Sequence, residues 1–351
     1  MEITSLDTGS ASRLINKKET DDSGPVPFRR RHLLDLDDLT PQELIKVLDT
    51  ADIMNEILRR PIKKVPTLRG KTVVTLFYEA STRTRVSFEI AAKNLGADTT
   101  SVAASSSSVS KGESLVDTLC TLQALGADAV VIRHPYSGAP YLAAQHLKGS
   151  VINAGDGWHA HPTQGLLDAY TIRSKMGKLD GLQMVILGDI LHSRVARSNI
   201  WALTRLGVDV TLCGPATLMP AWFIEEAARN NGVVMPGLKV SFDLDRCIEG
   251  ADVVMALRLQ LERMQAGLLP SMREYIRMYQ LNSERLARAK PNALVMHPGP
   301  MNEGIEIAPD VAHGVQSVIE EQVSNGVAVR MAMLYLLIGP NVNVPMEGEK
   351  R

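Results

Sequence analysis

The spacing of apolar residues changes along the chain and predicts alternating helices and strands. Between residues 44 and 58, the apolar positions recur at helical spacing: Leu44, Val47, Leu48, Ala51, Met54 and Leu58. Just before them, Thr40, Pro41 and Glu43 have the arrangement of a capping box, which predicts the start of this helix. The run 72–77 is apolar and β-branched, which is typical of a strand buried on both faces.

Further strands are predicted in two series, with helical patterns between them. The first series has strands at 98–102, 129–132 and 150–153, and helices at 84–95, 113–125 and 139–147. After Met176-Gly177-Lys178, a second series has strands at 184–187, 208–212, 253–256 and 293–296. This alternation predicts an α/β fold with two domains, each a parallel sheet flanked by helices. The length of 351 residues also favours two domains.

The predicted domain boundaries follow from these two series and from local composition. Residues 1–28 are rich in Ser, Thr, Asp, Glu and Gly, so we expect a disordered extension there. Residues 29–175 form the first predicted domain, and residues 176–314 form the second. The last helix, predicted within 315–338, follows the second series along the chain, and we expect it to return to the first domain.

Composition restricts the classes of function. The 38 basic and 39 acidic residues leave a net charge of −1, so no global field favours nucleic acid or a membrane surface. We find no apolar run of the roughly 20 residues that a membrane span needs and no signal-peptide pattern. Cys120, Cys213 and Cys247 are too far apart for a zinc site or a disulfide framework, which predicts core thiols and a cytoplasmic location.

The segment after the first predicted strand carries the clearest candidate chemistry. Ser81-Thr82-Arg83-Thr84-Arg85 opens a predicted helix, where unpaired backbone amides and the helix dipole attract anions. Hydroxyl groups add donors, and guanidinium groups match phosphate oxygens. The carboxyl end of a parallel strand is also where open α/β sheets bind ligands. An ordinary helix start with two surface arginines is the alternative, but five such residues in a row favour an anion site.

These five residues resemble the carbamoyl phosphate signature of the aspartate and ornithine carbamoyltransferase family. Further segments that resemble this family follow in the family's order: 107–113, 131–135, 155–157, 161–164, 188–189, 192–198, 258–260 and 297–300. The resemblance implies a transferase that moves the carbamoyl group of carbamoyl phosphate to an amine.

Two positions indicate which amine accepts the group. Ornithine enzymes typically carry a His-Cys-Leu-Pro segment and a lysine or another residue at position 80, whereas this chain has His297-Pro298-Gly299-Pro300 and Ala80. Arg194 and Arg258 suit a substrate with two carboxylates and would repel the ammonium group of ornithine. The resemblance therefore implies L-aspartate as the acceptor, in pyrimidine biosynthesis. The alternatives are a carbamoyltransferase for another amine, a catalytically silent family member and, less favoured, a dinucleotide-binding protein.

The resemblance also assigns roles to single residues. Carbamoyl phosphate binding is assigned to Ser81, Thr82, Arg83, Thr84, Arg133, His161, Gln164, Gly299 and Pro300. The catalytic members of this set are Arg83, Thr84, Arg133 and His161. Aspartate binding is assigned to Lys111, Arg194, Arg258 and Gln260. Glu79 is assigned to a bridge with Arg194 and Arg263 that forms when the domains close.

Within this set, three residues are assigned to different parts of carbamoyl phosphate. Arg133 is assigned to the phosphate, His161 to the carbamoyl carbonyl oxygen and Gln164 to the carbamoyl amine. Without the resemblance, His161 would more often be a core or capping histidine, and Gln164 an exposed amide. Their place in a loop just after a predicted strand supports the functional interpretation.

The resemblance further implies a homotrimer whose subunits share active sites. Ser107 and Lys111 lie on a serine-rich loop and are assigned to the site of the neighbouring subunit, with Ser108 as the alternative to Ser107. Whether a regulatory or dihydroorotase partner binds is left open. No cofactor is expected, and no metal site is predicted, because His159 and His161 have no further ligands at metal-binding spacing.

Overall fold

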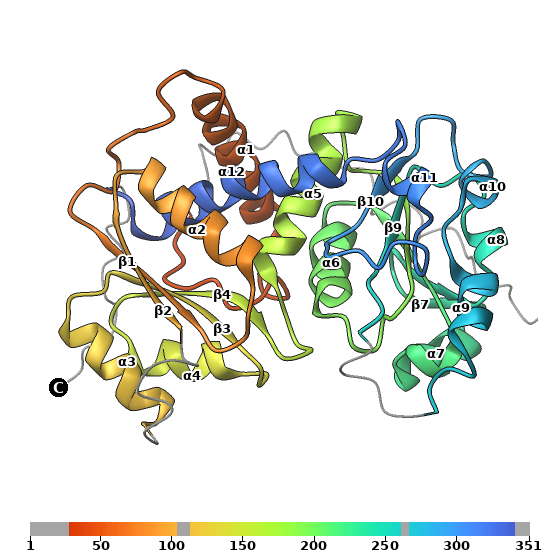
Figure 1. The fold of residues 1–351 in the computed structure, drawn as a ribbon, viewed down its shortest axis with the longest axis horizontal. Helices are drawn as coiled ribbons and strands as arrows, with labels where there is room; N and C mark the ends of the chain where they lie inside the picture. The colour runs from red at the N-terminus through yellow and green to blue at the C-terminus, as the bar shows by residue number, and fades with distance from the viewer. Residues whose placement is uncertain (1–27, 104–112, 261–266, 341–351) are drawn as a thin grey trace, which may run out of the picture.

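In the computed structural model, which describes residues 28–103, 113–260 and 267–340, the chain forms two α/β units (Figure 1). Each unit is built around its own sheet, and the two sheets lie toward opposite ends of the long axis of the molecule. The predicted fold class is therefore confirmed. Among the described residues, no helix has both the length and the apolar character that crossing a membrane requires.

The first unit holds a four-stranded parallel sheet in the order β2-β1-β3-β4. Its strands are β1 (Thr72–Phe77), β2 (Asp98–Ala103), β3 (Ala129–His134) and β4 (Ser150–Asp156). The helices of this unit are α1 (Pro41–Leu58), α2 (Thr82–Asn94), α3 (Leu115–Ala124) and α4 (Ala139–His146). Strands β1 and β4 are buried almost throughout, as expected of strands covered on both faces.

Helix α1 confirms the predicted capping box. The Glu43 N–H donates to Thr40 Oγ1 at 3.2 Å, and the Thr40 N–H donates to Glu43 Oε2 at 2.9 Å. Phe28, which the sequence placed in the extension, instead packs in the apolar core, so the ordered chain begins at least one residue earlier than predicted. The prediction of core thiols holds for Cys213, whereas Cys247 is half-buried and Cys120 is exposed.

The second unit holds a six-stranded sheet in the order β10-β9-β5-β6-β8-β7. Its strands are β5 (Gln183–Leu187), β6 (Asp209–Cys213), β7 (Val233–Met235), β8 (Leu238–Ser241), β9 (Val253–Ala256) and β10 (Leu294–Met296). Strand β7 is antiparallel to β8, so this sheet is not wholly parallel. The sequence did not predict β7 and β8, because both are short and carry no long apolar run.

Helices cover the second sheet and join the two units. The helices of the second unit are α6 (Arg194–Arg205), α7 (Ala221–Arg229), α8 (Leu244–Cys247), α9 (Met272–Tyr279), α10 (Ser283–Leu286) and α11 (Pro309–Ala312). Helix α5 (Pro162–Met176) packs against α1, α6 and α12, and α12 (Ile319–Ile338) packs against α1, α2 and α5 (Figure 1). One apolar core cluster continues through these helices from the first unit into the second.

Candidate functional site

A cavity of about 450 Å³ lies between the two units, at the carboxyl ends of their parallel strands. Every predicted site residue that the structure describes lines this cavity: Glu79, Ser81, Thr82, Arg83, Thr84, Arg133, His161, Gln164, Arg194, Arg258, Gln260, Gly299 and Pro300. The other assigned residues, Ser107 with its alternative Ser108, Lys111 and Arg263, lie outside the described residues. Residues that are far apart in the sequence therefore meet at one place.

The turn between β1 and α2 forms one part of the cavity wall. Ser81 is the N-cap residue of α2, its side chain makes no capping hydrogen bond, and the first turn of α2 carries no acidic residue. The cavity is lined by this first turn. The positive end of the helix therefore meets the cavity with no acidic residue in its own first turn and no capping side chain, which favours an anion there.

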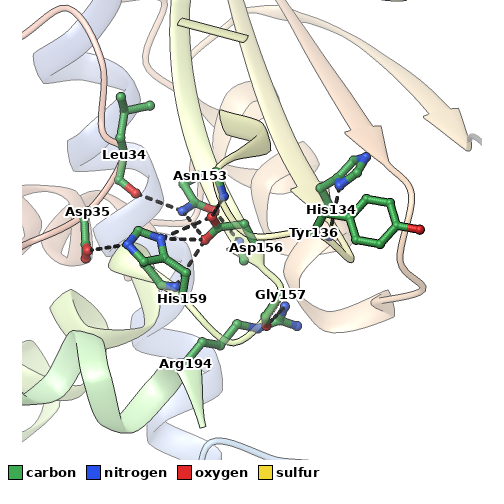
Figure 2. Close-up of polar contacts among 12 residues, drawn as sticks. Leu34, Asp35, His134, Tyr136, Asn153, Asp156, Gly157, His159 and Arg194 are labelled. Carbon is green, nitrogen blue, oxygen red and sulfur yellow. Dashed lines mark hydrogen bonds and ion pairs between the residues drawn. The ribbon is translucent and has the colours of Figure 1, made fainter. Parts of the chain in front are cut away.

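Glu79 lies between an arginine of each unit. Its Oε2 atom is 3.3 Å from Arg133 Nε and 2.9 Å from Arg194 Nη2. Arg194 comes from the start of α6 in the second unit, yet its Nη1 donates to the Gly157 carbonyl of the first unit at 3.0 Å (Figure 2). A Cβ atom at Gly155 would lie 3.0 Å from Arg194 Cζ and 3.3 Å from Arg133 Nη1. Glycine at that position therefore leaves room for both guanidinium groups.

His161 is buried in the cavity wall at the start of α5. Burial holds the pKa of His161 well below its usual range, and the nearby Arg133, Arg194 and Arg330 lower it further. The ring is therefore neutral at physiological pH. A neutral imidazole donates one hydrogen bond and adds no positive charge to a site that is already rich in arginine.

The loop that leads to His161 is held by a buried carboxylate at the end of β4. Asp156 accepts hydrogen bonds from Asn153 Nδ2 at 2.8 Å and from two backbone amides, and its Oδ2 lies 3.2 Å from His159 Nδ1 (Figure 2). His159 Nε2 lies 3.3 Å from Asp35 Oδ2, and the hydrogen bond to Asp156 raises the pKa of His159. Among the described residues, no cluster of three or more side chains is suited to hold a metal ion.

The second unit contributes three separate turns to the cavity, after β5, β9 and β10, and Arg194 follows the first of them. Arg258 and Gln260 follow β9, and the Gln260 N–H donates to the buried Asp189 at 3.4 Å. After β10, His297 Nδ1 accepts from the Gly299 N–H at 2.8 Å, so its Nε2 carries the proton and donates to Glu306 Oε1 at 3.2 Å. Internal polar contacts therefore hold each of these turns.

Two arginines face each other across the cavity. Burial lowers the pKa of Arg83, and the positive charge of Arg258 lowers it further. Gly299 has a φ of +64°, and a Cβ atom there would lie 3.1 Å from Arg83 Cζ. Main chain from the second unit therefore lies close to the Arg83 guanidinium, with no room for a side chain between them. An anion between the arginines would relieve their repulsion.

The polar residues that line the cavity and were not predicted include Gln322 and Arg330 of α12. Arg330 is buried, its guanidinium carbon lies 5.2 Å from the centroid of the Phe88 ring, and burial lowers its pKa to about 10. The one local signal is that a single arginine interrupts the apolar run 327–337. A buried charge of this kind needs partners, and the sequence does not name them.

Comparison with known proteins adds two family models and many relatives. Residues 31–174 match the model "Aspartate/ornithine carbamoyltransferase, carbamoyl-P binding domain", and residues 180–337 match "Aspartate/ornithine carbamoyltransferase, Asp/Orn binding domain". The aspartate carbamoyltransferase catalytic subunit of Roseiflexus sp. (strain RS-1) is 62% identical over 318 residues, which are 91% of this chain and 98% of that protein.

Solved structures show the same fold. Aspartate transcarbamoylase from Trypanosoma cruzi in complex with N-(phosphonacetyl)-L-aspartic acid has a TM-score of 0.79 at 29% identity, covering 90% of this chain and 98% of that one. Ornithine carbamoyltransferase from Pyrococcus furiosus has a TM-score of 0.78 at 30% identity, covering 89% and 98%. The fold is thus similar to enzymes with either acceptor.

Proposed function

The chain belongs to the aspartate/ornithine carbamoyltransferase family, and we propose that it transfers the carbamoyl group of carbamoyl phosphate to the amino group of L-aspartate. The products are N-carbamoyl-L-aspartate and phosphate. The family predicted from the sequence motifs is confirmed by both family models. The relative with 62% identity supports aspartate as the acceptor. The observation that supports the site is that one cavity is lined by the 81–84 turn, Arg194 and Arg258.

The first unit binds carbamoyl phosphate in this proposal. The start of α2 and Arg133 hold the phosphate, because both present donors to an anion. Arg83, Thr84 and the neutral ring of His161 donate to the carbamoyl oxygen, where negative charge grows during the reaction. Donors placed in this way contribute about 3 kcal/mol each in acyl-transfer sites. Gln164 accepts from the carbamoyl amine.

The second unit binds and orients aspartate. Arg194 and Arg258 bind its two carboxylates, and Gln260 and the main chain of Gly299 and Pro300 lie near the reacting groups. The neutral amine attacks the carbonyl carbon, a C–N bond forms, and the C–O bond to phosphate breaks. The departing phosphate takes the proton of the amine, so alignment of the two substrates carries most of the catalysis.

We further propose the domain division and the assembly. Residues 29–175, together with the last helix, bind carbamoyl phosphate, and residues 176–314 bind aspartate. Three subunits form a homotrimer in which Ser107 and Lys111 of one subunit complete the site of its neighbour. A cytoplasmic location stays a prediction from the sequence. Whether a regulatory or dihydroorotase partner binds stays open.

The experiment that tests the function is a transfer assay with the purified chain. Phosphate release and carbamoylated product are measured with L-aspartate and, separately, with L-ornithine. We expect a preference for aspartate of more than about 100-fold, because a site built for a carboxylate rejects an ammonium group. Transfer to ornithine alone would contradict the acceptor, and absence of transfer to either amine would contradict the function.

Shared sites have their own test. Oligomers of an Arg83→Ala chain and of a Lys111→Ala chain are dissociated. Each variant is then reassembled alone and together with the other, and light scattering gives the mass of each assembly. In mixed trimers, some sites receive neither substitution, so activity returns. A mixture that remains inactive at the mass of a trimer would contradict sharing of sites between subunits.

A further inference from the structure

A fully buried carboxylate lies directly behind the cavity wall. Asp168, on α5, is 0% exposed and does not line the cavity. Its Oδ1 accepts from Gln164 Nε2 at 3.0 Å and from Gln322 Nε2 at 2.8 Å, and its Oδ2 accepts from Asn199 Nδ2 at 2.8 Å. Three side-chain amides from three helices therefore converge on one acid that the substrates do not reach.

An ionised carboxylate can only accept hydrogen bonds, so it determines which way each amide points. Gln164 turns its nitrogen toward Asp168, and its oxygen is then the group available on the cavity side. Gln322 is fixed from both ends, because its Oε1 accepts from the His297 N–H at 3.0 Å while its Nε2 donates to Asp168. Rotating the Gln322 amide by half a turn would set its NH2 group against the His297 N–H and its oxygen against the Asp168 carboxylate.

The charge on Asp168 is maintained in spite of its burial. The pKa of Asp168 is raised to about 6, because the effect of burial exceeds the opposing effects of the three amides and of the positive charge of Arg330. The acid is therefore mostly ionised at neutral pH. Because both of its oxygens are already bonded to amides, Asp168 is not placed to take a proton from a substrate.

We propose that Asp168 is a positioning residue, which holds the Gln164 amide with its oxygen toward the carbamoyl amine. The inference rests on the proposed function, in which Gln164 meets the amine of carbamoyl phosphate. With the amide reversed, the NH2 group of Gln164 would face the NH2 group of the substrate. One hydrogen bond would be lost and two donors would be opposed.

The test is a double-mutant cycle between Asp168→Ala and Gln164→Ala, with kcat/KM for carbamoyl phosphate as the readout at saturating aspartate. In Asp168→Ala, a water molecule can occupy the space of the carboxylate. Because water donates as well as accepts, the amide of Gln164 is then free to reverse. We expect kcat/KM to fall about 10-fold, as for the loss of one buried hydrogen bond.

The outcome depends on whether Asp168 acts through Gln164. In the Gln164→Ala background, Asp168→Ala should cost less than about 2-fold more, because coupled residues are not additive. Losses that simply multiply would overturn the inference. Asp168→Asn should recover only part of the activity, since its oxygen can still accept from Gln164 and Gln322, whereas its NH2 group would face the NH2 group of Asn199, which donates to Asp168 Oδ2 in the parent chain.

A matched control separates positioning from loosening of the helices. Thr171 is buried one turn further along α5, donates to the Leu167 carbonyl at 2.7 Å and accepts from Asn325 Nδ2 of α12 at 3.0 Å, outside the cavity. Thr171→Val should lower the melting temperature and leave kcat/KM unchanged. An equal loss of kcat/KM in Thr171→Val would overturn the positioning role.

Two further results would change how the cycle is interpreted: failure of Asp168→Ala to fold, and absence of transfer by the parent chain. If Asp168→Ala shows no cooperative unfolding transition, Asp168→Ser replaces it in the cycle, because a hydroxyl also donates and accepts and so releases the amide. The unvaried chain is assayed first. If that chain transfers no carbamoyl group, the proposed function fails and the inference fails with it, whereas an active chain with multiplying losses overturns the inference alone.

Discussion

The two walls of the cavity are assembled in different ways. The first-unit wall comes mainly from one turn, 79–84, and from residues at the ends of the neighbouring strands β3 and β4, which a parallel sheet brings to the same edge. The second-unit wall comes from separate turns after β5, β9 and β10. A local motif can therefore build the phosphate side, whereas the acceptor side depends on three turns being held in place independently.

Arg194 shows that the walls are not independent. It belongs to α6 of the second unit, but its contacts with Glu79 and the Gly157 carbonyl are with the first unit. We therefore expect substitutions in the first-unit wall to lower mainly kcat, and substitutions in the second-unit wall to raise mainly the KM for aspartate. Substitutions where the two walls meet should change both quantities.

The largest expected effect is that of Arg83→Ala. Removal of a donor to the developing negative charge should lower kcat by about 10²- to 10³-fold, with the unfolding transition preserved because the side chain lies in a cavity wall. Initial rates and thermal unfolding measure both quantities. Lys93→Ala, an exposed cation on the same helix, is the control. A variant with a near-normal rate would remove Arg83 from the mechanism.

Arg258→Ala should separate the walls most clearly. The loss of a charged hydrogen bond to a carboxylate costs about 1.5–3 kcal/mol, so the KM for aspartate should rise at least about 10-fold. Phosphate binding, measured by calorimetry, should change little. Arg246→Ala, an exposed arginine of the second unit, is the control. An equal weakening of phosphate binding would show that the walls do not divide the substrates as proposed.

Gly155→Ala tests the place where the walls meet. Its Cβ atom would press on Arg194 and Arg133, and its φ of +115° is unfavourable for alanine, so strain of about 1–3 kcal/mol is expected. We expect lower stability and weaker use of both substrates in initial-rate measurements. Gly126→Ala also has a positive φ, +86°, but meets nothing within 4 Å. It should lose stability only, and equal loss of activity in both variants would refute the steric explanation.

The smallest expected effect concerns pH and the loop before His161. Because folding raises the pKa of His159 above its unfolded value of 6.5, its contribution to stability is present in full below pH 6.5 and is lost as the pH rises through the folded pKa. The difference in free energy of unfolding between the parent and His159→Gln should therefore be larger at pH 5.5 than at pH 8.5. The reverse order, measured by urea unfolding, would contradict the ion pair of His159 with Asp156.

Much of the fold was predictable because its signals are local. Capping of α1 depends on Thr40 and Glu43, three residues apart, and the buried strands show as short apolar runs. Helix α5 was missed because residues 162–172 are buried on all sides, which removes the amphipathic period. Strand β7 was missed because it is three residues long and its side chains are partly exposed.

The residues around the cavity divide in the same way. The resemblance of the motifs to the family nominates the 81–84 turn, Arg133, His161, Arg194 and Arg258, and the side chains of the turn and of the three arginines also suit a phosphate and two carboxylates. No local pattern places Gln322 beside Asp168, which is 154 residues away, or adds Arg133 to the contact between Glu79 and Arg194 that the resemblance implied. Such contacts depend on how α5, α6 and α12 pack, because the direction of a buried amide follows from its partners in space and not from its neighbours along the chain.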